Sequence, residues 1–299
     1  MDFTDQLKVA KPTAKANTLK TYNTILKTMY KKVFGNTEAP DIDNFKNVAK
    51  IMDHVKNDPL QTRKTKLSAI VALVKVPEYT EEIFKSAQAY KKQTDKSEMT
   101  EKLEEAEITK EEMTAVQARV KNIADSLNKK TELTMRDIQE IQNYIIVSLY
   151  TQIPPRRAID FTEMVLKPTD KETQNYIDLK KSKFVFNNYK TATHTGTQEI
   201  AIPASLKKIL TKWIKIIPDE VETLLFNSRR EPLINVTLNQ RLNEIFGPRK
   251  AVNSLRHYFL SQKYGDTIRG EDALKADMVA MGSNIIQARN YIKVNPKPE

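Results

Sequence analysis

Hydrophobic residues recur at every third or fourth position through the first third of the chain, a period that predicts amphipathic helices. We predict four short helices in this part. Their apolar stripes are Leu19, Tyr22, Ile25, Leu26, Met29, Tyr30 and Val33; Phe45, Val48, Met52 and Val55; Leu67, Ile70, Val71 and Val74; and Ile83, Phe84, Ala87 and Tyr90. Asn17 and Asp43 are placed to cap the first two helices. Four helices in so short a stretch indicate one compact helical domain.

The apolar period fades between Lys96 and Met113, where the sequence KSEMTEKLEEAEITKEEM is acidic and has no wide apolar face. Such a segment is typical of a hinge or a solvated helix. We therefore predict a helical domain over residues 1–96, an acidic linker over 97–113 and a second domain over 114–299.

The second half begins with a helical pattern from Thr134 to Tyr150, and the pattern changes between Asn175 and Pro203. This later stretch is rich in β-branched and aromatic residues around a turn-like THTG, which predicts a small antiparallel sheet or hairpin. Helical patterns resume after it, with breaks near Gly247 and Gly265. The fold class that we predict is mainly α with a small antiparallel β-sheet (α+β).

The charge balance narrows the choice of partners. The chain has 49 Lys and Arg residues against 38 Asp and Glu, a formal net charge of +11 at pH 7. Such an excess favours a polyanion, because each cation placed on a phosphate releases condensed counterions. Charge alone leaves open the alternative of an ordinary basic protein without a nucleic-acid partner.

Residue types that are absent or rare exclude several kinds of chemistry. The chain has no cysteine, which excludes disulfides, thiolate nucleophiles and cysteine-bound zinc, and its 3 histidines disfavour a histidine-based zinc site. The N-terminus has no apolar signal region, and the longest apolar run, Ile70 to Val74, is too short to cross a bilayer. We expect an intracellular, soluble protein that does not bind a membrane.

Candidate chemistry comes from four segments of the second half, which are PPRRAIDFTEM at Pro154–Met164, the hairpin lysine Lys190, NSLRHYF at Asn253–Phe259 and MGSNIIQARNYIKV at Met281–Val294. In the first segment, Asp160 follows Arg157 three residues later, and apolar residues follow at the fourth and seventh positions. Arg156 fits this pattern less well, because its acid comes at the fourth position.

Taken together, the four segments resemble the catalytic domain of tyrosine recombinases over residues 133–294. The first half resembles the family's core-binding domain more loosely, which implies a DNA-binding domain followed by a catalytic domain. Each segment alone has an ordinary explanation, such as a surface ion pair, a solvent-facing lysine or a packed tyrosine. The interpretation depends on four segments that occur together, in order and at the family's spacings.

The resemblance implies a role for each candidate residue. Arg157 and Arg256 would offer planar forks of donors to the non-bridging oxygens of a DNA phosphate, where negative charge develops. Tyr291 would attack the phosphorus and form a 3′-phosphotyrosine, and the two nearby arginines would lower the pKa of its phenol. Lys190 would protonate the leaving 5′ oxygen. This chemistry requires no metal and no nucleotide cofactor.

Two positions depart from the family's pattern. Asn253 stands where the family has the first histidine of its HxxR motif, and Ser283 stands where a histidine or tryptophan is usual. His257 cannot replace the missing histidine, because neighbouring helical residues point about 100° apart. Asn253 can donate a hydrogen bond but cannot titrate, so we expect catalysis slower by roughly 10²–10⁴. The alternative is that Asn253 only caps the helix that carries the LRH tripeptide.

Three basic residues of the first half are candidates for contact with DNA. Arg63, Lys64 and Lys66 lie near the N-terminal end of a predicted helix, where phosphates are favoured. The alternative is an ordinary solvated face. The family implies double-stranded DNA as the partner, two domains that close around it, and a homo-oligomer, normally a tetramer, on the DNA. Few residues follow Tyr291, which predicts a different or weaker assembly.

Other functions stay open at this point. A type IB topoisomerase uses similar chemistry, and a catalytically weakened DNA-binding descendant of the family would keep the basic surface. The presence of Arg157, Arg256 and Tyr291 argues against such a descendant. A metal-dependent integrase or nuclease needs carboxylates gathered on a mixed sheet, whereas this sequence predicts little sheet. The cysteine-free, lysine- and asparagine-rich composition suggests a virus or a mobile element as the source.

Overall fold

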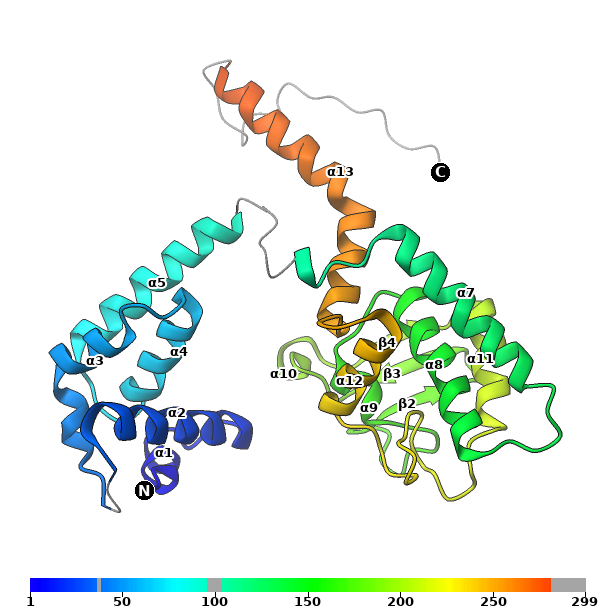
Figure 1. Ribbon diagram of the computed structural model, residues 1–299, viewed down its shortest axis with the longest axis horizontal. Helices are drawn as coiled ribbons and strands as arrows, with labels where there is room; N and C mark the ends of the chain where they lie inside the picture. Colours follow the sequence, from blue (N-terminus) through cyan, green and yellow to red (C-terminus); the bar gives the residue numbers. More distant parts are fainter. Residues whose placement is uncertain (37–38, 96–103, 281–299) are drawn as a thin grey trace. The chain divides into compact units, whose positions relative to one another are not determined.

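The computed structural model of the chain describes residues 1–36, 39–95 and 104–280. The chain divides into two compact units, Met1–Met99 and Thr100–Glu299, each with its own hydrophobic core (Figure 1). No helix in the described ranges is long and apolar enough to span a membrane.

The first unit is helical, and its elements are α1 (Thr4–Ala10), α2 (Ala16–Phe34), the 3₁₀ helix η1 (Ile42–Lys46), α3 (Val48–Val55), α4 (Leu60–Val71) and α5 (Pro77–Asp95). The predicted helices correspond to α2, α3, α4 and α5, whereas α1 has no counterpart in the prediction. An aromatic cluster forms the centre of the core, in which the rings of Phe3, Tyr30 and Phe45 lie 5.6–6.1 Å apart. The hydroxyl of Tyr79 on α5 donates to the carbonyl of Phe45 at 2.7 Å, which ties α5 to this centre.

Three details of the predicted helices are wrong. Asn17 lies inside α2, which starts without a side-chain cap, and Asn47 rather than Asp43 caps α3. The predicted apolar stripe of α5 also fails at Phe84, whose side chain is 61% exposed. The helix instead buries Tyr79 and Ser86. Because successive helical residues point about 100° apart, a helix that turns the face of Tyr79 inward turns Phe84 towards solvent.

The second unit surrounds one central helix, α8 (Met135–Thr151), which is buried along most of its length. Helices α7 (Lys110–Leu127) and α11 (Ala204–Ile214) pack against α8, as Figure 1 shows. The remaining helices are α9 (Ala158–Thr162), α10 (Ala192–Thr195), α12 (Asn235–Phe246) and α13 (Val252–Ala280). Helix α12 ends before Gly247, where a break was predicted, and Gly247 adopts a φ of 101°. Helix α13 continues through Gly265 without the predicted break. A glycine inside a helix costs only about 1 kcal/mol relative to alanine, so it need not end the helix.

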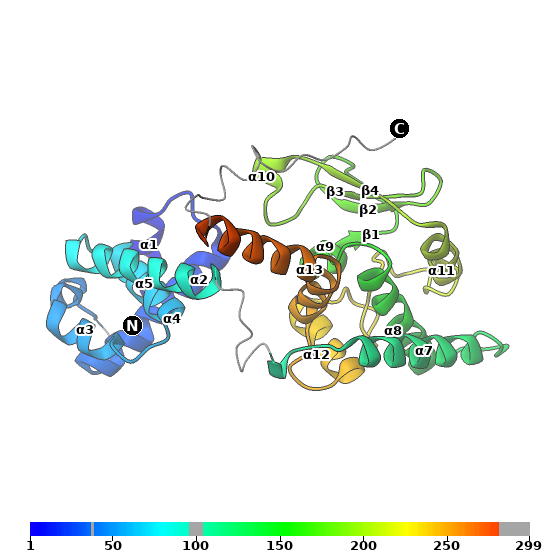
Figure 2. The ribbon, with the colours of Figure 1, turned by 90° about the horizontal axis from the view of Figure 1, so that it is seen from above.

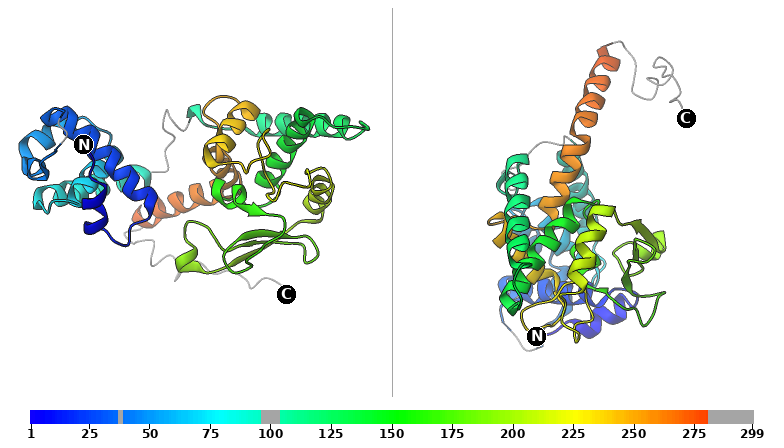
Figure 3. Two further views of the ribbon diagram at one scale, coloured as in Figure 1. Left: turned by 90° about the horizontal axis from the view of Figure 1, so that it is seen from below. Right: turned by 90° about the vertical axis from the view of Figure 1, so that its right-hand side faces the viewer.

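A four-stranded sheet forms a layer beside these helices (Figure 2; the light-green strands in Figure 3). Its strands lie in the order β1 (Met164–Val165), β2 (Asn175–Asp178), β3 (Lys183–Phe186) and β4 (Gln198–Ala201). Strands β2, β3 and β4 are antiparallel, as predicted, and the short β1 adds a parallel edge strand that the sequence pattern did not indicate. The Phe161 ring packs edge-on against Tyr150 at 5.5 Å and against Phe186 at 5.9 Å, which joins α8 to the sheet.

The acidic segment contributes to the second unit before residue 114. Ile108 and Met113 are each only 3% exposed and belong to the core of this unit. Thr109 caps α7 in a reciprocal capping box with Glu112. The unit therefore starts earlier along the chain than the boundary that the acidic composition suggests, because two apolar residues among many glutamates are enough to anchor a helix end.

The N-terminus of α8 generates a prediction about acid stability. Hydrogen bonds from Lys130 and Thr134 lower the pKa of Asp137 from its usual value of 3.8 to about 2. Because the pKa is lower in the folded state, this contribution to stability is present above about pH 4 and is lost as the pH falls towards 2. Asp137→Asn should therefore destabilise the protein at pH 7, and the difference from wild type should shrink between pH 4 and pH 2.

Urea unfolding of both proteins across this pH range measures the difference. Asp219→Asn is the matched control, because Asp219 is exposed and its carboxyl forms no hydrogen bond or ion pair among the described residues. A destabilisation by Asp137→Asn that stays constant down to pH 2 would contradict the ionic origin of this interaction.

Candidate active site of the second unit

The two adjacent arginines before α9 have different surroundings. The side chain of Arg156 is only 14% exposed, and its Nε donates to Oδ2 of Asp160 at 2.8 Å. One of its terminal nitrogens donates to Oε1 of Gln198 on β4 at 2.5 Å. Arg157 occupies the N-cap position of α9, is half-buried, and its guanidinium has no hydrogen bond or close ion pair among the described residues. Arg156 is thus held by intramolecular contacts, while the donors of Arg157 stay available for a ligand.

The guanidinium of Arg156 also lies over two aromatic rings. Its central carbon is 4.1 Å from the ring centroid of Phe186 and 5.0 Å from that of Tyr189. Phe186 is the last residue of β3, and Tyr189 follows it in the connection to β4. The segment before α9 is therefore fixed to the end of the β3–β4 hairpin.

The buried hydroxyl of Tyr150 on α8 is affected by charges from this segment and from α13. The hydroxyl of Tyr150 and Oδ1 of Asp160 are both buried, and neither has a hydrogen-bond partner among the described residues. Burial raises the pKa of the Tyr150 hydroxyl, the negative charge of Asp160 raises it further, and the positive charge of Arg256 opposes both. Asp160 and Arg256 thus both act electrostatically on the Tyr150 hydroxyl, and α13, which carries Arg256, packs against α8.

Burial also dominates the titration of Asp160. Its carboxyl is only 2% exposed, and this burial raises its pKa, although the adjacent Arg156 guanidinium lowers it. A carboxylate in such a position requires a well-placed cation, because an uncompensated buried charge is costly. Arg156 supplies that cation.

The start of α13 places Arg256 and Asn253 on the same face of the helix, since they are one turn apart. Arg256 is half-buried, and Asn253 is exposed without a side-chain hydrogen bond in the described structure. The alternative that Asn253 caps this helix is wrong. The cap comes from Ser254, whose hydroxyl accepts the N–H of Ala251 at 3.2 Å. The side chain of Asn253 is therefore free to contact a ligand.

Lys190 is exposed in the connection between β3 and β4 and has no side-chain partner in the described part of the chain. Its neighbour Tyr189 is buried, and the Tyr189 hydroxyl donates to the carbonyl of Gly196 at 2.5 Å. This bond closes the connection, which contains the short helix α10. Because Tyr189 also contacts Arg156, Lys190 lies beside the segment that carries Arg157.

Tyr291 and Ser283 lie outside the described residues. The described part of the site consists of Arg157, Arg256, Lys190 and Asn253, which come from α9, α13 and the β3–β4 connection. Sequence reasoning missed the contacts of Arg156 with Gln198 and the central position of Tyr150. One signal was present, because Arg156 and Asp160 have the four-residue spacing of a helical ion pair.

The basic residues predicted to contact DNA in the first unit are largely occupied within that unit. Arg63 donates to Oε1 of Glu82 at 2.8 Å and to the carbonyl of Val55 at 3.2 Å. Lys66 donates to both carboxylate oxygens of Asp58, at 2.8 and 3.0 Å. Lys64 is half-buried, and its ammonium has no partner among the described residues. Of the three, Lys64 has the cation that is free to bind a phosphate.

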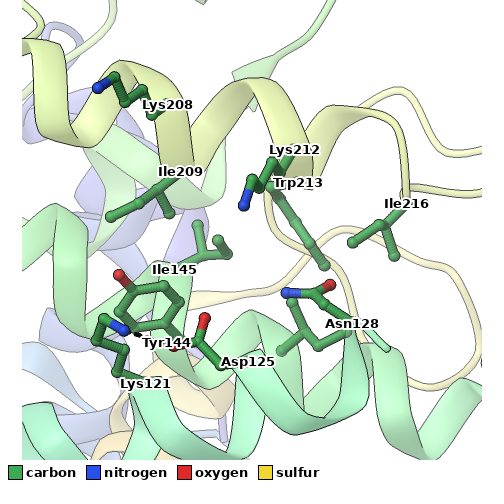
Figure 4. A pocket seen from close by; sticks show the side chains of 11 residues that line it. Lys121, Asp125, Asn128, Tyr144, Ile145, Lys208, Ile209, Lys212, Trp213 and Ile216 are labelled. Carbon is green, nitrogen blue, oxygen red and sulfur yellow. Dashed lines mark hydrogen bonds and ion pairs between the residues drawn. The ribbon is translucent and has the colours of Figure 1, made fainter. Parts of the chain in front are cut away.

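A pocket of about 210 Å³ lies elsewhere in the second unit, between α7, α8 and α11 (Figure 4). Tyr144, Ile145 and Trp213 contribute to its lining, and Lys208 and Lys212 project from α11 beside it (Figure 4). None of the candidate catalytic residues lines this pocket. The candidate residues instead lie on exposed or half-buried positions of other elements, which suits a large substrate better than a small enclosed one.

Comparisons with known proteins reveal a distant likeness of fold. No protein-family model matches the sequence, and no curated protein matches it significantly. The XerA recombinase structure is similar at 11% identity and a TM-score of 0.38, over 87% of this chain and 83% of that one. The XerH site-specific recombinase in a pre-cleavage complex with its difH substrate is similar at 16% identity and a TM-score of 0.42, over 88% and 75% of the two chains. A post-cleavage XerH complex with a palindromic difH substrate gives 15% identity and a TM-score of 0.40, over 87% and 73%.

The cap of α13 generates a prediction that separates Asn253 from its neighbour. Ser254→Ala should lower the free energy of unfolding by about 1 kcal/mol, because it removes the acceptor for the Ala251 N–H. Asn253→Ala should leave stability within about 0.5 kcal/mol of wild type, as expected for an exposed side chain without a partner. Denaturant unfolding of the two variants measures both effects. A larger loss for Asn253→Ala than for Ser254→Ala would restore Asn253 as the cap.

The contacts of Arg63 generate a second prediction. Arg63→Gln should lower the free energy of unfolding by about 1–3 kcal/mol, because it removes the half-buried ion pair with Glu82 and the guanidinium bonds to the carbonyls of Val55 and Lys56. Lys64→Gln, one residue along the same helix, is the matched control and should change stability by less than about 0.5 kcal/mol. Equal stabilities of the two variants would show that the Arg63–Glu82 contact contributes little to the first unit.

Proposed function

We propose that the protein is a tyrosine recombinase, which cuts and rejoins duplex DNA through a covalent bond to Tyr291. One observation carries the proposal. Asp160, in the segment of Arg157, and Arg256, on α13, both act electrostatically on the buried hydroxyl of Tyr150 on α8, against which α13 packs, and the connection that bears Lys190 lies beside the segment of Arg157. These are the segments that resemble the family, and they supply two arginines and one lysine whose side chains form no hydrogen bond or close ion pair among the described residues.

The two arginines provide the electrostatic part of the chemistry. A phosphodiester carries one negative charge, and charge accumulates on its non-bridging oxygens when a nucleophile adds to phosphorus. Arg157 and Arg256 would each place a planar fork of N–H donors on these oxygens, and such charge-assisted bonds are strong. Donors that are fixed in advance stabilise the transition state more than the substrate, because they need not reorganise during the reaction.

In the cleavage step, the phenolic oxygen of Tyr291 attacks phosphorus and the bond from phosphorus to the 5′ oxygen breaks. The electron pair of that bond stays with the 5′ oxygen, which takes a proton from the Lys190 ammonium and leaves as a hydroxyl group. The phenolic proton of Tyr291 passes to water. Rejoining reverses these steps, so the phosphotyrosine conserves the energy of the broken bond and no nucleotide cofactor is consumed.

Asn253 would act in this site by a hydrogen bond alone. It shares the face of Arg256 and has a free side chain, so it is placed to donate to a phosphate oxygen or to Tyr291. An amide does not exchange a proton at neutral pH, and loss of a general acid or base typically costs roughly 10²–10⁴ in rate. We therefore propose a slow enzyme. The substitution also favours the second candidate function, a DNA-binding descendant of the family with little or no cleavage.

Double-stranded DNA is the proposed partner, and a homotetramer is the proposed assembly on it. The net charge of +11 supports a polyanionic ligand, and Lys64 offers a free cation in the first unit. Arg63 and Lys66 would act indirectly, since their internal ion pairs hold the helix from which Lys64 projects. A monomeric topoisomerase of type IB would use the same chemistry, and the oligomeric state during rejoining separates the two.

The central prediction concerns the covalent bond. Wild-type protein should become attached to a nicked DNA substrate whose short 5′ fragment diffuses away after cleavage, because rejoining is then prevented. Tyr291→Phe should give no attached product, since it lacks the attacking oxygen. Denaturing gel electrophoresis with labelled DNA measures the product directly.

Tyr264→Phe is the matched control, because Tyr264 is an exposed tyrosine of α13 whose loss should leave attachment intact. A covalent product that persists in Tyr291→Phe would overturn the assignment of the nucleophile. DNA binding by the wild type without any attached product would favour the weakened descendant.

A further inference from the structure

We propose that Arg156 is a positioning residue, which holds the connection bearing Lys190 against the segment bearing Arg157 so that the lysine meets the leaving oxygen. This inference rests on the proposed function. It assigns to Arg156 a role distinct from that of its neighbour, which the sequence pattern favours as the phosphate ligand.

The register of the β3–β4 hairpin brings two contacts of Arg156 together. Phe186 on β3 and Gln198 on β4 are paired directly across the sheet, and they are the last pair before the connection that carries Lys190. Paired residues of antiparallel strands project on the same face. Arg156 contacts both of them, with its guanidinium over the Phe186 ring at 4.1 Å and a hydrogen bond to Gln198 at 2.5 Å. One side chain therefore contacts both strands at the base of the connection.

The backbone between the end of β3 and Lys190 is held by hydrogen bonds. The side chain of Asn175 on β2 accepts the N–H groups of Asn187 and Asn188 at 2.8 and 2.7 Å, which fixes the chain as it leaves β3. Tyr189 follows, contacts Arg156 and closes the connection through its bond to Gly196. Lys190 is the next residue. The Lys190 backbone is thus joined directly to a residue that contacts the Arg156 guanidinium, whereas the Lys190 side chain forms no hydrogen bond among the described residues.

The Arg156 guanidinium also binds the segment that carries Arg157. Its Nε donates to the buried carboxylate of Asp160, which lies in the first turn of α9. The carboxylate, the amide of Gln198 and two aromatic faces leave Arg156 few donors for a DNA phosphate. A guanidinium has the planar fork and the delocalised charge that satisfy all four partners at once, and a lysine ammonium does not. Arg156 therefore suits the fixing of two segments, and Arg157 suits the binding of phosphate.

The test separates loss of proton donation from a general loss of activity. DNA in which sulfur replaces the bridging 5′ oxygen at the cleavage position releases a thiolate, which leaves without a proton because a thiol is far more acidic than an alcohol. Arg156→Lys, Gln198→Ala and Lys190→Ala are compared on this DNA and on ordinary DNA, with the initial rate of covalent attachment as the readout. Arg136→Lys is the matched control, because Arg136 is exposed on α8 and has no partner among the described residues.

On ordinary DNA, Arg156→Lys should slow attachment roughly tenfold to a hundredfold, since misplacement of a reacting group by about 1 Å has effects of this size. On the sulfur-containing DNA, the rates of Arg156→Lys and Lys190→Ala should return to within about threefold of wild type. Gln198→Ala should show the same pattern with a smaller effect, and it decides the outcome if Arg156→Lys does not fold. Arg157→Ala should stay slow on both substrates, because its phosphate contact is still missing.

Equal slowing of Arg156→Lys or Gln198→Ala on both substrates would overturn the inference and leave Arg156 with a structural role only. A wild-type rate for Gln198→Ala on ordinary DNA would overturn it as well. Failure of the proposed function is distinguishable, because the wild-type protein would then attach to neither substrate.

Discussion

The burial of Asp160 is the constraint on which the candidate site depends. This carboxyl belongs to α9, is buried, and acts electrostatically on the buried hydroxyl of Tyr150, while the next residue, Phe161, packs against the Tyr150 ring. A charge in that position is tolerated only with a bound cation, and Arg156 provides one at 2.8 Å. Because Arg156 also reaches the β3–β4 hairpin, the neutralisation of one buried charge fixes the relative position of two elements that carry candidate residues.

Because of this constraint, the two neighbouring arginines differ in the availability of their donors. Arg156 uses its donors on Asp160 and Gln198 and stacks on aromatic rings, whereas Arg157, at the start of α9, keeps its guanidinium available. Rigid support behind a free functional group is what electrostatic catalysis requires, since a donor that must reorganise loses part of its effect. The same division is present in the first unit, where Arg63 and Lys66 bind acidic neighbours and Lys64 does not. Charge counted along the sequence therefore overstates the charge that a ligand can meet.

Much of the fold follows from local patterns. The stripe from Thr134 to Tyr150 predicts α8, and the β-branched stretch after Asn175 predicts the antiparallel strands, because both patterns are set by the geometry of a single element. Two of the failures have one origin. Phe84 is exposed and α13 continues through Gly265, since the face that a helix buries and the length to which it extends depend on what packs against it. The parallel edge strand β1 was missed for another reason, because Met164 and Val165 alone are too few residues to form a recognisable strand pattern.

The sequence by itself determined the order of the candidate segments, the residue types suited to phosphate chemistry, and the departures at Asn253 and Ser283. Only the tertiary structure decided which residues of these segments are free. It assigned the cap of α13 to Ser254 and the ion pair with Asp160 to Arg156, and it packed α13 against α8. The physical reason is that a residue type fixes what a side chain can donate or accept, whereas its partners come from elements brought together by the packing of the core.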